Sequence, residues 1–249
     1  NDFTSVIHFA GLKATNESIK KPQLYYENNV HGSMQLLKVM TKFKVKQIVF
    51  SSSATVYGEP NQLPIKESMR VNRPTNPYGM TKIIIETLLM DIFKSDNDWR
   101  IINLRYFNPV GAHSSGLIGE SPSTAPSNLM PIISKVAAGR LKKINVYGGD
   151  YDTHDGTCIR DYIHVEDLAC GHVEALKKIE NNPGFWTINL GTGKGHFVLD
   201  VIKAYQKASG KNIDYEVVER RKGDVASCYA DVKYAKEILG WKAKKNLEE

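Results

Sequence analysis

Gln47-Ile-Val-Phe-Ser-Ser-Ser53 is an apolar run that ends in three serines, and Arg100-Ile-Ile-Asn-Leu-Arg-Tyr106 is a second apolar run. Short runs of this kind are typical of buried strands. Between the two, a helical pattern begins at Asn76-Pro77 and continues to about Lys94. A strand, a helix and a strand in succession favour parallel strands with the helix on one face. This stretch therefore predicts an α/β fold around a parallel sheet.

A similar unit precedes this stretch. Val6–Ala10 reads VIHFA and ends at Gly11, which predicts another buried strand. Pro22 suits the first turn of a helix. Apolar residues then recur at every third or fourth position: Tyr26, Val30, Met34, Leu37 and Met40. That spacing predicts an amphipathic helix whose apolar face carries these residues. Because parallel strands end at one edge of a sheet, we expect functional loops at that edge.

The spacing changes after Asn108. Residues 113–127 form a long loop rich in Gly, Ser and Pro, and loops of this length are usually functional. Gly191-Thr-Gly193-Lys-Gly195 lacks the third glycine of a dinucleotide-binding loop, so we interpret it as a tight turn between a strand and a helix. The remaining patterns predict helices over 129–139, 165–178, 197–209 and 232–239, and strands over 144–147, 185–190 and 215–218. These later elements indicate a smaller, mixed second lobe.

Composition places the chain among ordinary globular proteins. Its 249 residues are 41% hydrophobic and 24% charged, which argues against collagen, coiled coil and extended disorder. No apolar run approaches the ~18 residues of a membrane span, so we expect no membrane association. The three cysteines form no CxxC pair, which is typical of a reducing compartment such as the cytoplasm. The net charge of +6 comes from scattered basic residues without an RNA-binding motif, so we expect no nucleic-acid partner.

Tyr78 and Lys82 form the pattern that carries chemistry. They lie four residues apart and therefore share one helix face. An ammonium group near a phenol favours the phenolate, so we expect Lys82 to lower the pKa of Tyr78 and make it a base near neutral pH. Such pairs also arise by chance on solvated helix faces. Here, however, Ser53 ends the preceding strand, and its hydroxyl can bond a substrate oxygen beside the tyrosine.

A serine at a strand end, followed by tyrosine and lysine on the next helix, resembles the Ser–Tyr–Lys triad of the short-chain dehydrogenases/reductases. Further motifs stand in order: Phe9–Ala14 (FAGLKA), Ser51–Gly58 (SSSATVYG), Asn76–Gly79 (NPYG), Leu104–Ala112 (LRYFNPVGA), Asn128–Pro131 (NLMP), Asp155–Thr157 (DGT), Arg160–His164 (RDYIH) and Asn189–Gly191 (NLG). Together they resemble the UDP-glucose 4-epimerases, an extended branch of that superfamily, from Val6 to the end of the chain. Related 4,6-dehydratases carry an acidic pair where this chain has Ala54 and Thr55, so we do not expect elimination of water.

The resemblance implies a Rossmann-like, doubly wound parallel sheet that binds NAD, and a smaller mixed α/β lobe that binds the UDP-sugar. The first would comprise residues 1–107 with a returning segment near 162–195, and the second residues 108–161 and 196–249. Tyr78 would take the proton of the sugar 4-hydroxyl while hydride leaves C4 for NAD. Ser53 would bond that oxygen, and Lys82 would hold the nicotinamide ribose. The 4-keto sugar would then turn over and take the hydride back on its other face, which interconverts UDP-glucose and UDP-galactose in galactose metabolism.

The resemblance also assigns binding residues. On the cofactor side they are Lys13, Asn28, Ser51, Tyr78, Lys82 and Tyr106. On the substrate side they are Ser53, Phe107, Asn108, Asn128, Leu129, Arg160, Arg221, Asp224 and Cys228. The asparagines of the second set and Leu129 would contact the uridine diphosphate, the two arginines would clamp its pyrophosphate, and Asp224 would bond the ribose. Tyr106 and Phe107 would line the sugar pocket. From the residues alone, a surface charge is an equal interpretation of either arginine, and no metal site is expected.

Several further expectations follow from the resemblance and the chain ends. Cys228 stands where family members carry either tyrosine or a smaller residue, so UDP-N-acetyl sugars should also fit. The helices over 22–41 and 77–94 would form a homodimer interface. Residues 246–249 look like the first turn of a helix, and we interpret both ends as cuts, with the glycine loop for NAD outside the chain. Two alternatives stay open: a UDP-glucuronate epimerase or decarboxylase, and an inert sugar-nucleotide-binding protein.

Overall fold

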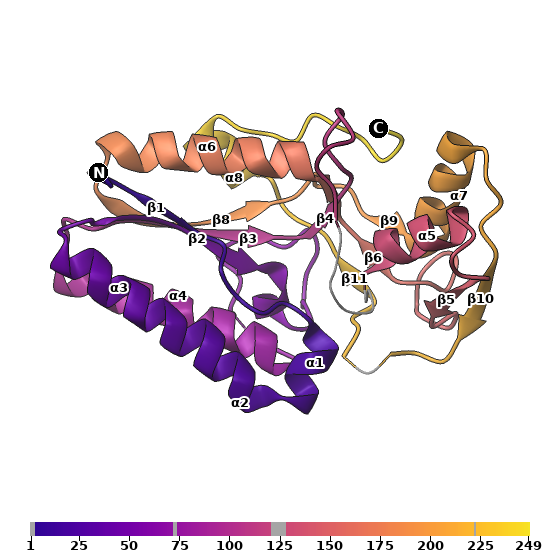
Figure 1. Ribbon diagram of the computed structural model, residues 1–249, viewed down its shortest axis with the longest axis horizontal. Helices are drawn as coiled ribbons and strands as arrows, with labels where there is room; N and C mark the ends of the chain where they lie inside the picture. Colours follow the sequence, from indigo (N-terminus) through magenta and orange to yellow (C-terminus); the bar gives the residue numbers. More distant parts are fainter. Residues whose placement is uncertain (1–2, 72–73, 121–127, 222) are drawn as a thin grey trace.

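A four-stranded parallel sheet organises the larger part of the molecule. The computed structural model describes residues 3–71, 74–120, 128–221 and 223–249. The sheet is built, in spatial order, from β1 (Val6–His8), β2 (Gln47–Ser53), β3 (Arg100–Tyr106) and β8 (Gly184–Leu190) (Figure 1). In its register Ser53 pairs with Tyr106, and Tyr106 pairs with Leu190. These strands therefore end at one edge, and the predicted α/β fold around a parallel sheet is confirmed.

Helices cover both faces of this sheet (Figure 1). One face carries α1 (Thr15–Lys20), α2 (Pro22–Tyr25), a π-helical stretch (Tyr26–His31), α3 (Gly32–Lys42) and α4 (Pro77–Ser95), and the other carries α6 (Val165–Asn181) and α8 (Lys233–Leu239). Successive residues of β2 serve the two faces. Phe50 packs in a cluster with Leu89 of α4, whereas Val49 packs in a cluster with Ala175 of α6. Because both faces are buried, this part of the strand is a continuous apolar run rather than an alternating one.

A smaller lobe lies beside the main sheet. In this lobe α5 (Leu129–Ala137) and α7 (Val198–Ser209) pack with a parallel pair of strands, β5 (Ile144–Tyr147) and β10 (Tyr215–Val218). Between the two parts lie β4 (Asn108–Val110), β6 (Ile159–Arg160), β7 (Tyr162–His164), β9 (His196–Phe197) and β11 (Ser227–Cys228) (Figure 1). The sequence patterns did not predict these strands, because two or three residues show no periodicity.

The helix predicted from position 22 is interrupted, and its inward face differs from the prediction. Tyr26 and Met34 are exposed. The buried positions are instead Tyr25, Asn29 and Ser33. Their polar groups hold this part of the helix, since the hydroxyls of Tyr25 and Ser33 donate to backbone carbonyls at 2.8 and 2.6 Å. Of the predicted apolar positions, Leu37 and Met40 are buried in the core and Val30 is partly buried against it.

The turn at residues 191–195 is tied down by one buried carboxylate. Asp161 accepts hydrogen bonds from the backbone N–H groups of Thr192, Gly193 and Ala230 at 2.8, 3.0 and 3.2 Å. A Cβ atom at Gly191 would stand 2.5 Å from Asp161 Oδ2, so this close approach requires glycine. The glycines therefore form a tight turn after a strand, as predicted, and Asp161 takes the N–H groups of Thr192 and Gly193 within it.

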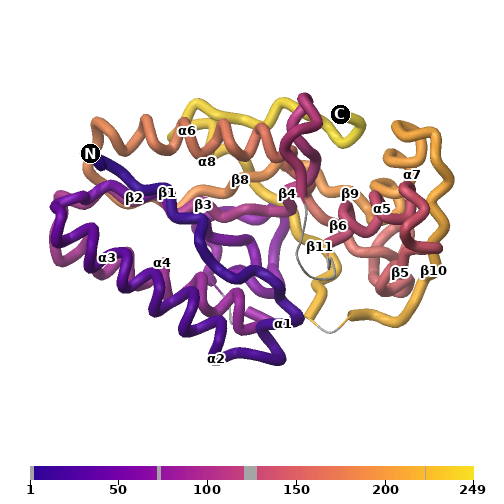
Figure 2. The backbone as a smooth tube through the Cα atoms, in the orientation of Figure 1, coloured from indigo at the N-terminus to yellow at the C-terminus, as the bar shows by residue number. Residues whose placement is uncertain are grey.

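The C-terminal segment runs back over α6 and α8 (Figure 2). The backbone N–H groups of Lys244 and Lys245 donate to Asp167 Oδ2 at 2.9 and 2.8 Å. Residues 246–249 are not part of a helix in the structure, but Asn246 and Glu249 exchange the two hydrogen bonds of a helix capping box, so the expected first turn stays a prediction. The expected division into domains stays a prediction, but α8 packs in the core of the main sheet and not in the smaller lobe to which 196–249 was assigned.

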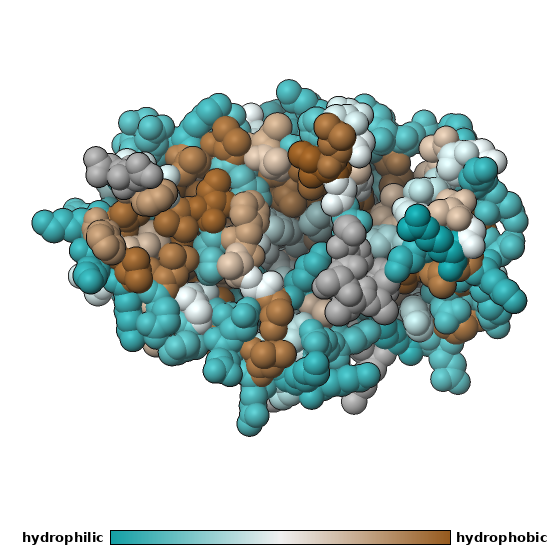
Figure 3. Space-filling view, in the orientation of Figure 1, coloured by the Kyte–Doolittle hydropathy of each residue, from teal (hydrophilic) through white to brown (hydrophobic). Residues whose placement is uncertain are grey.

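An apolar patch lies over β1 and α3 (Figure 3). It includes the exposed side chains of Phe3, Val39 and Phe43, beside the edge strand of the main sheet.

Within the described residues, no helix combines the length and apolarity that a bilayer crossing would need.

Candidate active site

The first turn of α4 is fixed against the end of β2. Asn76 caps the helix, and its side chain accepts from Gly79 N at 2.9 Å. A Cβ atom at Gly79 would meet Thr55 Cγ2 at 2.9 Å, so the helix can approach the turn after β2 only with glycine at this position. This close packing places Tyr78 beside Ser53.

Ser53 ends β2 and caps the short 3₁₀ turn Ala54–Tyr57. Its Oγ accepts from Thr55 N at 3.2 Å and lies 2.9 Å from Thr55 Oγ1. A hydrogen bond between Ser53 and Tyr78 acts to lower the pKa of the phenol. The structure therefore brings together two hydroxyl groups that the sequence places 25 residues apart.

The pKa of Tyr78 is nevertheless raised. Burial, which disfavours the phenolate, outweighs the hydrogen bond from Ser53. The expectation that Lys82 lowers this pKa is wrong for the chain by itself. Lys82 Nζ lies 5.7 Å from the centroid of the Tyr78 ring, so it faces the ring rather than pairing with the hydroxyl.

Lys82 is a buried ammonium group. Its side chain lies on α4, one turn beyond Tyr78, and the residue is only 4% exposed. Its Nζ donates to the backbone carbonyl of Ser51 at 2.6 Å and lies 4.8 Å from the centroid of the Phe50 ring. Burial lowers its pKa to about 8, against a partial opposing effect of Glu86. An ammonium group has three donors, and within the described residues only the bond to Ser51 is made, so donors remain for a ligand.

The other residues expected on the cofactor side lie at the same edge or near it. Tyr106 ends β3 beside Ser53 and is hydrogen-bonded to His172 of α6. Lys13 is exposed and forms a 3.2 Å ion pair with Glu120. Asn28 is exposed and donates to its neighbour Asn29 at 2.9 Å.

Asn29 was not predicted from the sequence to have a role, yet it is the buried amide of the neighbouring pair Asn28 and Asn29. It is 2% exposed, and it bonds the backbone N–H and carbonyl of Leu12 at 2.8 and 3.0 Å. Its Nδ2 also donates to Thr81 Oγ1 of α4 at 3.2 Å. Asn29 therefore joins the loop after β1 to the helix that carries Tyr78.

The residues expected to contact the sugar and the uridine lie toward the smaller lobe. Phe107 and Asn108 follow β3, and the backbone of Asn108 donates to Asp161 O at 2.9 Å. Leu129 begins α5 and packs in the core of the smaller lobe, while Asn128, at the N-cap position, is exposed. The structure thus spreads this set over several elements and does not gather it as tightly as Ser53 and Tyr78.

The two arginines expected to hold the pyrophosphate, Arg160 and Arg221, differ in whether a carboxylate is paired with them. Arg160 of β6 pairs in register with Cys228 of β11, and within the described residues it has no carboxylate partner. Arg221 holds Asp224 through two hydrogen bonds of 3.1 and 2.9 Å, and this pairing raises its pKa against the effect of burial. Burial raises the pKa of Cys228 to about 11, so this thiol is neutral at ordinary pH.

The comparisons with known proteins agree with this geometry. Residues 1–191 match the family model described as the NAD dependent epimerase/dehydratase family. The chain belongs to this family. Among its relatives, the UDP-glucose 4-epimerase of Haemophilus influenzae is 54% identical over 248 residues, which are 100% of this chain and 73% of that protein. The UDP-glucose 4-epimerase of Homo sapiens is 54% identical over 246 residues, or 99% of this chain and 71% of that protein.

A solved structure gives the same result for this epimerase/dehydratase chain. The UDP-glucose 4-epimerase from Bifidobacterium longum in complex with NAD+ and UDP superposes with a TM-score of 0.96 at 55% identity, over 100% of this chain and 74% of that one. The resemblance inferred from the motifs is therefore confirmed.

The sequence did not predict a buried ion pair in this family member, which joins Glu86 of α4 to Arg105 of β3. Glu86 is 8% and Arg105 5% exposed, and they form two hydrogen bonds of 3.0 and 2.6 Å. A signal for it was present: Glu86 stands four residues after Lys82, on the face that Tyr78 begins, in a helix that is apolar over most of its surface. A charge at that position needs a buried partner.

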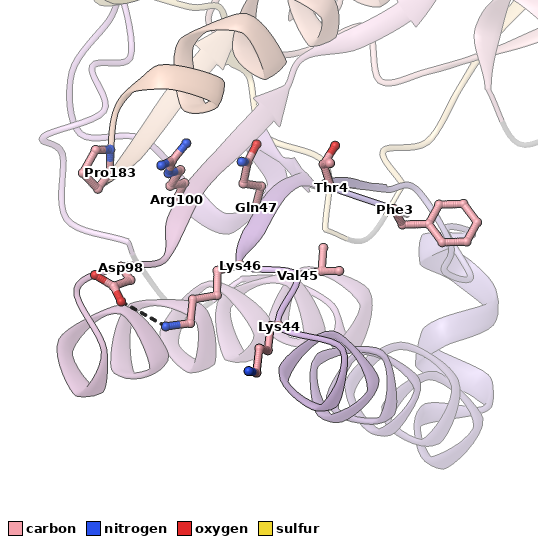
Figure 4. A pocket seen from close by; sticks show the side chains of 9 residues that line it. All are labelled: Phe3, Thr4, Lys44, Val45, Lys46, Gln47, Asp98, Arg100 and Pro183. Atoms are coloured by element: carbon pink, nitrogen blue, oxygen red, sulfur yellow. Dashed lines mark hydrogen bonds and ion pairs between the residues drawn. The ribbon is translucent and has the colours of Figure 1, made fainter. Parts of the chain in front are cut away.

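A separate hollow of about 500 Å³ lies at the opposite edge of the main sheet (Figure 4). Lys44, Lys46, Arg100 and Asp98 line it, among others. Lys46 is paired with Asp96 and Asp98 at 2.8 and 3.2 Å, and Arg100 donates to backbone carbonyls at the end of α6. Lys46 and Arg100 are therefore used in structural contacts, and no residue of the expected site lines the hollow.

Proposed function

We propose that the chain interconverts UDP-glucose and UDP-galactose by transient oxidation at C4 of the sugar with NAD. The observation that carries this proposal is the meeting of Ser53, Tyr78 and Lys82 at the carboxyl edge of a parallel sheet. The identity of more than half to UDP-glucose 4-epimerases, over almost three quarters of their length, supports the same reaction.

The residues present fit NAD. Lys82 keeps unused donors at the sheet edge, which suits the hydroxyl groups of a ribose, and Ser51 and Tyr106 lie beside it. Lys13 and Asn28 are exposed on the loop and helix after β1, where they would contact the rest of the cofactor. When bound, NAD supplies the hydride acceptor at C4 and the hydride donor for the return.

The chain's own residues handle the proton. Tyr78 would take it from the 4-hydroxyl at its phenol oxygen, and Ser53 would bond the same sugar oxygen. The hydrogen bond from Ser53 already acts to lower the pKa of Tyr78, and the nearby charge of Lys82 would oppose the build-up of negative charge on the phenolate. Lys82 is buried and Tyr78 is half-buried, and the limited access of water strengthens these interactions.

The UDP-sugar would lie between the end of β3 and the smaller lobe. We propose that Asn108, Asn128 and Leu129 contact the uridine diphosphate and that Arg160 and Arg221 hold its pyrophosphate. Arg160 is suited to this because its charge is unpaired within the described residues, whereas Arg221 brings its charge together with Asp224. Asp224 would accept from the uridine ribose, and Phe107 with Tyr106 would line the sugar pocket.

An assay with UDP-galactose tests this function. UDP-glucose formed by the enzyme is oxidised by a coupling dehydrogenase, and NADH is followed. Formation of UDP-glucose by the purified protein supports the proposal. Turnover of UDP-glucuronate without turnover of UDP-galactose would favour the alternative enzyme class, and binding of both without turnover would favour a catalytically inert binding protein.

Cys228 bears on the range of substrates. Its side chain is smaller than tyrosine and lies opposite Arg160, so we propose that UDP-N-acetylglucosamine and UDP-N-acetylgalactosamine are also accepted. Turnover of UDP-glucose with none of UDP-N-acetylglucosamine would contradict this.

We also propose a cytoplasmic homodimer that acts in galactose metabolism. The helices over 22–41 and 77–94 would form the interface, and the exposed apolar side chains of Leu24, Tyr26, Met34 and Val39 on the first of them support it. The three cysteines are all unpaired, which suits a reducing compartment. Light scattering after gel filtration should give twice the monomer mass; a monomer mass would refute the interface.

A further inference from the structure

A row of buried polar side chains crosses the main sheet one residue inside its carboxyl edge. Ser52 of β2, Arg105 of β3 and Asn189 of β8 are direct neighbours in the register. They are 1%, 5% and 0% exposed. A parallel sheet covered on both faces normally carries apolar side chains at such positions. The row therefore needs a reason other than packing.

Glu86 of α4 is fixed by this row. Its carboxylate accepts from Arg105 Nε at 3.0 Å, from Arg105 Nη2 at 2.6 Å and from Ser52 Oγ at 2.5 Å. The guanidinium carbon of Arg105 in turn lies 4.7 Å from the centroid of the Tyr57 ring. A two-point pair with a third donor holds a carboxylate in a single orientation.

The same carboxylate stands one helical turn beyond Lys82. Residues four apart on a helix are surface neighbours, and the negative charge of Glu86 acts to raise the pKa of Lys82. Yet the two form no ion pair. Because Arg105 and Ser52 occupy the carboxylate, it acts on Lys82 through its charge and leaves the ammonium hydrogen bonds free.

The other groups around Lys82 carry no negative charge. His8 of β1 is neutral, since burial and then Lys82 lower its pKa to about 4. Tyr78 on α4, Tyr25 of α2 and Tyr106 of β3 are neutral phenols, because burial raises the pKa of each. Arg105 of β3 is a cation behind Glu86. Within the described residues, Glu86 is thus the one anion that acts on Lys82.

We propose that Glu86, fixed by Arg105 and Ser52, is a positioning residue that keeps Lys82 charged beside Tyr78 without pairing with it. A carboxylate free to move would bond the ammonium and draw it away from the tyrosine. The use of the charged lysine in catalysis rests on the proposed function, but the coupling between Glu86 and Lys82 does not.

The test measures the charge of Lys82 directly. The protein is labelled with 15N-lysine, and the Nζ resonance of Lys82, assigned by its loss in K82M, is followed against pH. In E86Q the midpoint should fall by about one pH unit, because an anion one helical turn away is lost. In R105M it should rise by a similar amount, because the anion is no longer neutralised. S52A keeps both charges and the two bonds from Arg105 that hold the carboxylate, so it should leave the midpoint unchanged.

The alkaline limb of kcat with UDP-galactose should move in the same directions. Opposite shifts in E86Q and R105M support the proposal, since a merely structural defect would not change sign between them. Shifts of one sign, or none, would overturn it. If E86Q does not fold, R105M is compared with the double variant E86Q/R105M instead. The proposal then expects a lower midpoint of Lys82 titration in the double variant, because the charge of Glu86 has again been removed. Absence of epimerisation in the unsubstituted protein would contradict the proposed function, and the resonance would still report on Glu86.

Discussion

Lys82→Met should separate stability from activity. The pKa of Lys82 falls from 10.5 to about 8 through burial, so the folded protein disfavours the ammonium by about 3 kcal/mol relative to the unfolded chain. Methionine has a similar length and needs no hydration. It loses the 2.6 Å bond to the carbonyl of Ser51, which costs about 1–2 kcal/mol. We therefore expect K82M to be more stable than the unsubstituted protein by about 1–2 kcal/mol at pH 7, and inactive.

The difference in stability between K82M and the unsubstituted protein should depend on pH. Between pH 8 and 10.5 the unfolded chain keeps the lysine proton that the folded protein has lost, so the free energy of unfolding of the unsubstituted protein rises with pH. The advantage of K82M is thus complete below pH 8 and disappears toward 10.5. Urea unfolding followed by circular dichroism at pH 7 and pH 10 measures it. K38M, on the exposed face of α3, is the control and should show no such trend. A K82M protein less stable at pH 7, or an advantage equal at both pH values, would refute the reasoning.

Three further substitutions test other parts of the site. Tyr78→Phe should lower kcat by about 10²–10⁴-fold, as for loss of a general base, with calorimetric binding of UDP unchanged; an active variant would remove Tyr78 from the reaction. Cys228→Tyr should abolish turnover of UDP-N-acetylglucosamine and spare UDP-glucose in the coupled assay, and equal losses on both would count against a steric role. Asp161→Asn should reduce the free energy of unfolding by about 2 kcal/mol, because an amide NH2 would face backbone N–H groups; urea unfolding with no change would show that these bonds contribute little.

The main elements could be predicted from the sequence because their signals are local. The strand over 100–106 and the helix over 77–94 are long enough to show a run or a period, and the structure reproduces both within one residue. The helix after Pro22 shows the limit of this reasoning. Its inward positions Asn29 and Ser33 are polar, and only contacts with Leu12 and His8, distant in sequence, explain their burial.

The candidate site likewise has residues that could be predicted from local spacing and others that depend on contacts distant in sequence. Ser53, Tyr78 and Lys82 were found because their spacing matches a known motif. The sign of the pKa shift of Tyr78 was predicted wrongly, because the depth of burial, which dominates it, cannot be read from spacing. Glu86 was passed over because its partner Arg105 lies on a strand of the sheet that α4 covers, and a contact between a helix and a sheet depends on how the two pack, which residue spacing does not show.

The polar row through Ser52, Arg105 and Asn189 has a consequence for how the sheet opens. The row continues from Arg105 over the Tyr57 ring, through a 2.7 Å bond from Tyr57 Oη to Asn189 Oδ1, to a 2.8 Å bond from Asn189 N to Glu67. At the amino edge, by contrast, the sheet borders an open hollow. Local unfolding should therefore begin at the amino edge, and backbone amides near residues 52, 105 and 189 should exchange with deuterium only through global unfolding. The strands are thus anchored at the end where the chemistry takes place and can loosen at the other.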